Sequence, residues 1–160
     1  SVCHTRLVNV LPKTKAIDVT HFPLVVLILP PTMDGSYADV LEEDTKAILS
    51  ARTKYVSVTD TAAVAGMTDA KTRKRMGEWA KSREEDFKRW QAANALVVGS
   101  AIVRAGISAV HWFAPPAVPT LVETDFAAAL AFLRGHAVRV GIPTDGIDAF
   151  AATRKARLSG

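Results

Sequence analysis

A continuous apolar run that ends in two prolines constrains this chain more than any other feature. Residues 22–31 read Phe-Pro-Leu-Val-Val-Leu-Ile-Leu-Pro-Pro. The run is too short for a stable helix and rich in β-branched side chains, and proline continues neither a helix nor a central strand. A strand without a polar face needs cover on both sides. The run therefore predicts a strand inside a sheet that carries helices on both faces.

Segments typical of strands and of helices alternate along the rest of the chain. Further strands are predicted from apolar or β-branched runs at 55–59, 95–98 and 120–123, with an earlier one at 7–10 or 17–19. Helices are predicted from apolar residues at helical spacing over 36–49, 68–92, 101–113, 125–137 and 145–158. Such alternation indicates an α/β fold. We expect a mixed or mostly parallel sheet of four or five strands with helices packed on it.

Two hydroxyl residues mark predicted helix starts. Ser36 has an acid three residues later, as in a capping box, and Thr68 is followed by Asp69 in the first turn. The basic run at 71–75 is interpreted as a solvated helix face. One stripe of the same helix carries large apolar side chains, for which core packing is the better interpretation than a stacking surface: Met76, Trp79, Phe87 and Trp90.

The length and the charge distribution limit the possible classes of function. The chain has 160 residues, which fits one domain. Its net charge of +4 comes from the two ends, since residues 21–138 contain thirteen basic and thirteen acidic side chains. A body without net charge does not attract a polyanion over its whole surface. We therefore expect no nucleic-acid binding.

Cysteine content and hydropathy indicate the compartment. The chain has a single cysteine, Cys3, so it forms no intrachain disulfide. The lack of a disulfide is typical of proteins in a reducing compartment. No apolar run reaches the length that spans a bilayer, and residues 1–6 do not have the pattern of a signal peptide. We expect a cytoplasmic protein without membrane insertion.

Three stretches together carry a resemblance to a known family. They are the strand Phe22-Pro-Leu-Val-Val-Leu, the strand, loop and long basic helix that carries Trp79, and a closing unit. That unit contains Ala95-Leu-Val-Val-Gly-Ser, an apolar helix, Trp112-Phe-Ala-Pro-Pro-Ala-Val-Pro-Thr and Phe126-Ala-Ala-Ala-Leu-Ala-Phe-Leu. Over residues 5–137 this pattern resembles the SpoIIAA-like (STAS-like) family. The resemblance implies a STAS-like domain over 1–138, with 139–160 as an additional amphipathic helix.

The resemblance implies regulation by protein contact rather than catalysis. In such domains a phosphorylated serine after a core strand controls binding to a partner, within an Asp-Ser-Ser-Gly signature. Here the matching loop reads Asp60-Thr-Ala-Ala-Val-Ala-Gly-Met-Thr-Asp69, which lacks that signature. Thr68 and Thr61 are the candidate phosphorylation sites, Thr68 because a helix N-terminus stabilises a phosphate. The plain alternative for Thr68 is a helix cap.

Two other classes of function stay open. The apolar helix 101–113 and the proline-rich turn after it predict a cleft for a lipid or other apolar molecule at the strand ends. Gly99 and Ser100, between a strand and a helix, are candidate contacts for an anion or ligand, although a tight turn is the commoner explanation of such a pair. The third class, an enzyme, rests only on Asp60, Asp69 and nearby hydroxyls.

Cofactors and partners are predicted only in outline. The four histidines are scattered singly, without metal-ligand spacing, and no nucleotide-binding motif is present. We therefore expect no cofactor and no metal. We expect a protein partner, and the helix at 145–158 either packs on its own domain or forms a homodimer contact.

Overall fold

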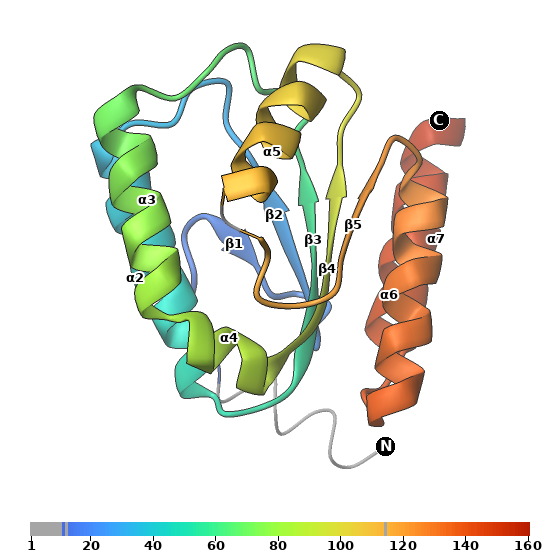
Figure 1. Cartoon of the computed structure of the whole chain (residues 1–160). Coiled ribbons are helices and arrows are strands. Elements are labelled where there is room, and N and C mark those ends of the chain that lie inside the picture. The colour runs from blue at the N-terminus through green and yellow to red at the C-terminus, as the bar shows by residue number, and fades with distance from the viewer. Residues whose placement is uncertain (1–10, 12, 114) are drawn as a thin grey trace.

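The protein is an α/β structure built on one mixed five-stranded sheet (Figure 1). The computed structural model describes residues 11, 13–113 and 115–160. The strands lie in chain order and are β1 (Ile17–Asp18), β2 (Leu24–Ile28), β3 (Tyr55–Asp60), β4 (Gln91–Val97) and β5 (Thr120–Glu123). Only β1 is antiparallel to its neighbour. The predicted fold class is confirmed at this level, while Cys3 and the candidate strand at 7–10 lie outside the described residues.

The helices cover both faces of the sheet. They are α2 (Gly35–Ser50), α3 (Ala70–Ser82), α4 (Glu84–Trp90), α5 (Ala101–Phe113), α6 (Phe126–Val140) and α7 (Asp145–Ser159). Neighbouring parallel strands joined by right-handed crossovers place their connecting helices on the same face. Helices α2, α3 and α4 accordingly lie on one side with α5, and α6 and α7 lie on the other (Figure 1).

The larger hydrophobic cluster fills the space between the sheet and α6. Successive side chains of a strand face opposite sides, so alternate residues of the central strands point into this cluster. Helix α6 contributes residues at spacings of three and four, with Ala129, Leu133 and Ala137 fully buried. The strand members are Leu24, Val26, Val56, Val58, Ala93, Ala95 and Val97.

The second cluster lies between the sheet and α2. Its buried members include Val25 and Tyr55 from the strands and Leu41 and Ile48 from α2. Large side chains of α3 and α4 pack against it only partly buried: Met76, Phe87 and Trp90. Trp79 meets the edge of Phe87 with ring centroids 6.1 Å apart. The core-packing interpretation of the apolar stripe therefore holds in part: three of its side chains pack on the cluster without being buried, and Trp79 contacts the stripe rather than the cluster.

Two helices begin at a residue other than the predicted cap. The cap of α2 is Asp34, whose carboxylate accepts from the N–H of Tyr37 at 2.9 Å and from the hydroxyl of Ser36 at 3.0 Å. The cap of α3 is Asp69, which accepts from the N–H of Thr72 at 2.9 Å. A carboxylate also favours the positive end of the helix dipole, so aspartate displaces the neighbouring hydroxyl from this role.

The single helix predicted over 68–92 is wrong. The chain breaks at Arg83 into α3 and α4, and residues 91–94 belong to β4 rather than to a helix. The Gln-Ala-Ala-Asn sequence at 91–94 has little intrinsic preference for a strand. It is held as one because Gln91, Ala93 and Asn94 pair with β3, and Asn94 also pairs with Thr120 of β5.

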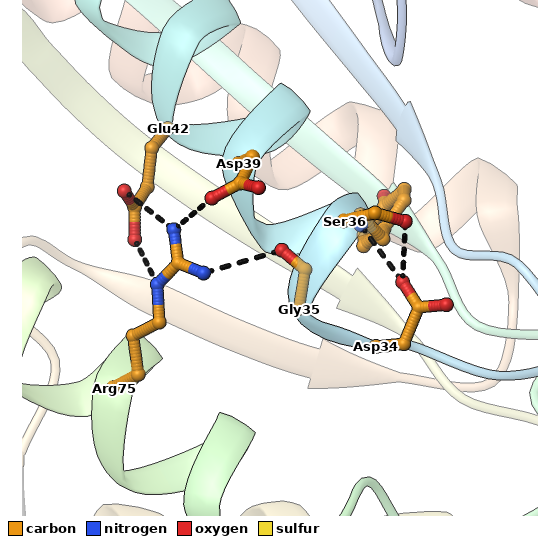
Figure 2. Close-up of polar contacts among 7 residues, drawn as sticks. Asp34, Gly35, Ser36, Asp39, Glu42 and Arg75 are labelled. Carbon is orange, nitrogen blue, oxygen red and sulfur yellow. Dashed lines mark hydrogen bonds and ion pairs between the residues drawn. The ribbon is translucent and has the colours of Figure 1, made fainter.

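Arg75 joins α3 to α2 through a set of polar contacts (Figure 2). Its guanidinium donates to both carboxylate oxygens of Glu42, at 3.2 and 3.1 Å, and to the backbone carbonyl of Gly35 at 3.2 Å. It also contacts the carboxylate of Asp39. The planar guanidinium suits such two-point binding of a carboxylate. These contacts raise the pKa of Arg75, the bond to Glu42 most of all.

Helix α7 lies against α6, and Ile147 is its one fully buried residue, with Phe150 and Ala151 packed partly buried against the core. Ile147 is 3% exposed and belongs to the larger cluster. The backbone of Gly146 approaches the loop before β2 so closely that a Cβ there would lie 2.1 Å from the carbonyl oxygen of His21. The predicted helix at 145–158 is therefore present and packs on its own domain. Helix α6 runs to Val140, past the predicted boundary at 138, and Gly141 ends it at φ 75°.

Candidate functional site

An apolar groove lies at the edge of the sheet where the parallel strands end. In open α/β sheets this carboxyl edge is where ligands usually bind. The groove has a volume of about 330 Å³. Its floor is formed by residues at or just after the ends of three strands: Leu29, Thr61 and Leu96. Its walls come from the loop after β3 and from α5.

Helix α5 forms one wall although it is the most apolar helix on this side of the sheet. Along 101–111, where the side chains are described, no residue is buried, and Ile102 is 77% and Val110 56% exposed. Val103, Ile107 and Val110 recur at helical spacing and line the groove. Because apolar surface in water is unfavourable, a helix of this composition normally packs on the core. Here its apolar face covers an open groove.

The loop after β3 forms the opposite wall. The N–H of Ala65 donates to the carbonyl of Pro31 at 3.0 Å, which ties the loop to the end of the β2 segment. Met67 is 73% exposed, and Met33 lines the groove beside the loop. Methionine side chains are unbranched and adapt to irregular apolar surfaces. This wall can therefore adjust to the shape of a bound molecule.

Polar groups lie at several positions around this apolar surface. Arg73 on α3 lines the groove and donates to the backbone carbonyl of Thr68 at 2.6 Å. Ser100 lines it from the start of α5, and His111 lines it from the far end of that helix. Among the lining residues Arg73 is the permanently charged side chain. A mainly apolar surface with a few polar groups is typical of small-molecule sites.

The structure brings the two candidate phosphorylation sites to this groove in different environments. Thr61 is 4% exposed, and its hydroxyl donates to the carbonyl of Val97 at 2.9 Å. Thr68 is half-buried at the groove, one residue before the cap of α3. A kinase would reach the hydroxyl of Thr61 only after that bond and the surrounding packing open. Modification of either residue stays a prediction.

Ser100 is also placed at the groove, while Gly99 is not among its lining residues. The hydroxyl of Ser100 accepts from the N–H of Val103 at 3.4 Å, and its carbonyl accepts from the N–H of Arg104 at 3.0 Å. Gly99 is exposed, and a Cβ there would meet open space. The geometry of 99–100 is that of a strand-to-helix turn whose serine caps α5.

The two carboxylates considered for catalysis do not share a site. Asp69 caps α3, and the hydrogen bond from the N–H of Thr72 lowers the pKa of its carboxyl. Asp60 lines a separate hollow of about 140 Å³ on the α7 side, together with His21 and Arg154. Its carboxylate accepts from the N–H of Ala62 at 2.9 Å. In the part of the chain that the structure describes, no three histidine, cysteine or acidic residues form a cluster that would hold a metal.

Sequence reasoning missed part of the groove. Met33 and Met67 carry no periodic signal because they are single residues in loops, and Arg73 belongs to the basic run at 71–75 that is interpreted as a solvated helix face. The apolar helix 101–113 was singled out, and the groove does lie beside it. The turn that follows it is less involved, since Pro115 is exposed and lies outside the lining set.

No family model, curated protein or solved structure matches the chain. None of the described helices has the length and apolar character needed to cross a membrane.

Proposed function

We propose that the protein is a binding domain whose groove between α5 and the loop after β3 holds an apolar small molecule. One observation carries the proposal. Helix α5 is apolar yet unburied along its described side chains, and its apolar face lines a groove at the carboxyl edge of the sheet. A ligand that covers this face removes apolar surface from water, at roughly 25 cal/mol for each Å².

The size of the groove favours a small molecule. Its volume of about 330 Å³ lies at the lower end of the range of roughly 300–1,000 Å³ that is typical of ligand pockets. The exposed side chains of Met67, Ile102 and Val110 extend the apolar surface at its mouth. A flexible chain of methylene groups suits a groove whose lining is mainly apolar.

The position of Arg73 favours a ligand that carries an anionic head group. The guanidinium of Arg73 lies beside the loop wall, where it already binds a backbone carbonyl. Guanidinium groups bind carboxylates through paired hydrogen bonds. The ligand class that combines both features is a fatty acid or a similar single-chain amphiphile.

A fluorescent fatty acid, dansyl-aminoundecanoic acid, tests the proposal by titration. We expect saturable binding to the parent protein, and a loss of about tenfold or more in Ile107→Asp, because the charge would be buried against the acyl chain. Ala105→Asp is the matched control, since Ala105 is exposed on the same helix and does not line the groove. Equal binding by the parent and Ile107→Asp would contradict the proposal.

A second titration tests the head group. Arg73→Gln is expected to weaken the acid but to leave a dansylated undecyl alcohol unaffected, because only the acid carries a charge to lose. Equal losses of affinity for the two probes would show that Arg73 acts through apolar contact and not through its charge.

A regulatory module of the STAS-like type is the second candidate function. The observation that favours it is Thr68, which is half-buried at the groove just ahead of α3. A phosphate there would lie near the positive end of α3 and near Arg73, which already contacts the Thr68 carbonyl. The module would bind a protein partner in one phosphorylation state and release it in the other.

Protein isolated from its own cells tests this candidate. A phosphate on Thr68, found by mass spectrometry of peptides, together with a stoichiometric partner that Thr68→Ala loses, would support it. Unmodified Thr68 under every growth condition sampled would count against it.

A further inference from the structure

A second hollow, basic in character, lies at the opposite edge of the sheet from the groove. It has a volume of about 540 Å³ and is formed by the end of α2 and by α4, at the amino ends of β3 and β4. In Figure 1 α4 lies at the foot of the sheet and α5 near its upper end. Asp86 is the one acidic side chain that lines this hollow. Four of the lining side chains are cationic: Lys46, Arg52, Arg83 and Arg89.

The charges of this hollow are largely uncompensated. Arg83 pairs with Asp86 at 3.5 Å. Across the described residues, no carboxylate lies within 4.0 Å of the cationic groups of Lys46, Arg52 or Arg89. Elsewhere, the side chains of Arg75, Lys88 and Arg134 do have acidic partners. A concentration of cations in one concave site therefore exists within a body of balanced charge.

The backbone of Arg52 provides an independent observation. Arg52 follows the end of α2 with φ of 49°, the one residue other than glycine with positive φ in the described chain. Glycine or asparagine usually occupies this left-handed position after a helix, because a Cβ there is strained. Arg52 keeps this strained conformation while its side chain lines the hollow.

Arg89 and Trp90 complete the wall on the α4 side. The guanidinium of Arg89 lies 5.9 Å from the ring centre of Trp90, within the range of a cation–π contact. Trp90 is half-buried and also lines the hollow. The site thus combines three guanidinium groups, an ammonium group and an aromatic surface.

We propose that this hollow, defined by Lys46, Arg52, Arg83 and Arg89, binds a small ligand that carries two or more phosphate groups. Arginine suits phosphate because its planar donors bind two oxygens at once. The cations converge on one concavity instead of following a surface stripe, which fits a compact anion rather than a long polyanion. The site is independent of the groove, so either can fail without the other.

Calorimetric titration of the intact protein with inorganic tripolyphosphate tests this site. We expect one binding site whose affinity falls as salt rises. Arg52→Gly is the informative variant, since glycine adopts positive φ without strain. It is expected to weaken tripolyphosphate binding about tenfold or more, as for a lost charge-assisted hydrogen bond. Its thermal unfolding midpoint is expected to stay the same or to rise.

Lys71→Gln is the matched control, because it removes one positive charge from an exposed position on α3, outside the hollow. Equal binding by Arg52→Gly and the parent, or an equal loss in Lys71→Gln, would overturn the proposal. So would tighter binding of polyglutamate or single-stranded RNA than of tripolyphosphate, since a long polyanion would then be the ligand. Arg52→Gly is also expected to bind the fatty acid as tightly as the parent does, because Arg52 does not line the groove.

Discussion

The carboxylate of Asp44 accepts a hydrogen bond of 2.6 Å from the backbone N–H of Ala16. The same carboxylate accepts from the N–H groups of Lys15 and Ile17, at 3.0 and 2.9 Å. Asp44 is 4% exposed, so these bonds replace water almost completely. One side chain of α2 therefore fixes the backbone that leads into β1.

Asp44→Ala is expected to destabilise the protein by about 3 kcal/mol, because it leaves buried N–H groups without an acceptor. Urea denaturation followed by circular dichroism measures the change. Glu43→Gln is the control: Glu43 is exposed and pairs with Lys15 at 3.9 Å, so its loss should cost less than about 0.5 kcal/mol. Similar midpoints for the two variants would show that the three bonds add nothing to stability.

Two glycines are expected to respond in opposite directions to replacement by alanine. In Gly146→Ala the new Cβ would lie 2.1 Å from the carbonyl oxygen of His21, so α7 must move and about 2 kcal/mol or more is lost. Gly135 lies within α6, where a Cβ meets open space. Gly135→Ala should stabilise by about 0.5–1 kcal/mol through helix propensity. Thermal unfolding of both variants checks the signs, and a neutral Gly146→Ala would contradict the close approach.

Substitutions at Ile107 and Leu133 are expected to distinguish the groove from the hydrophobic core. Leu133 is fully buried in the cluster under α6, and Leu133→Ala should cost about 3 kcal/mol. Ile107 lines the groove and is only half-buried, so Ile107→Asp should cost less than about 1 kcal/mol of stability while it weakens fatty-acid binding about tenfold or more. A large loss of stability in Ile107→Asp would show instead that α5 is part of the folding core.

Alkaline pH should destabilise the protein through its two tyrosines. Burial raises the pKa of Tyr55, and burial together with the charge of Asp44 raises the pKa of Tyr37. Both groups must stay neutral in the folded state. Their contribution to stability is therefore complete below the unfolded pKa of about 10 and is lost as pH rises above it.

Absorbance of phenolate, measured against pH with and without urea, checks this expectation. Both tyrosines should ionise at higher pH in the native protein, and Tyr55→Phe should retain more stability above about pH 10 than the parent. Coincident titration curves in the two solvents would contradict it.

The sheet could largely be predicted from the sequence because its strands carry local signals. The run at 22–31 contains β2, and the predicted strands at 55–59 and 120–123 correspond to β3 and β5. The first four residues of β4 could not be predicted, since Gln91 to Asn94 form a strand only through their neighbours. The break at Arg83 could not be predicted either, because neither glycine nor proline marks it.

The site was predicted less well, for a physical reason. The apolar helix 101–113 predicts a cleft at the strand ends, but nothing local to it indicates that the loop after β3, rather than the proline-rich turn, forms the opposite wall. The basic hollow was not predicted because its four cations come from two separate segments, and only the fold brings them together. Ser100 is predicted as a ligand contact at a strand-to-helix turn and does line the groove, whereas Thr68 is predicted only as a phosphorylation site and reaches the groove through the fold.

The two edge strands of the sheet limit how one copy of the protein can pair with another. One edge strand, β1, has two residues and the other, β5, has four, directly after Pro119. Short edges, and a proline that has no N–H to donate, give an incoming strand little backbone to pair with. Within the described residues, growth of the sheet from one molecule into the next is therefore disfavoured.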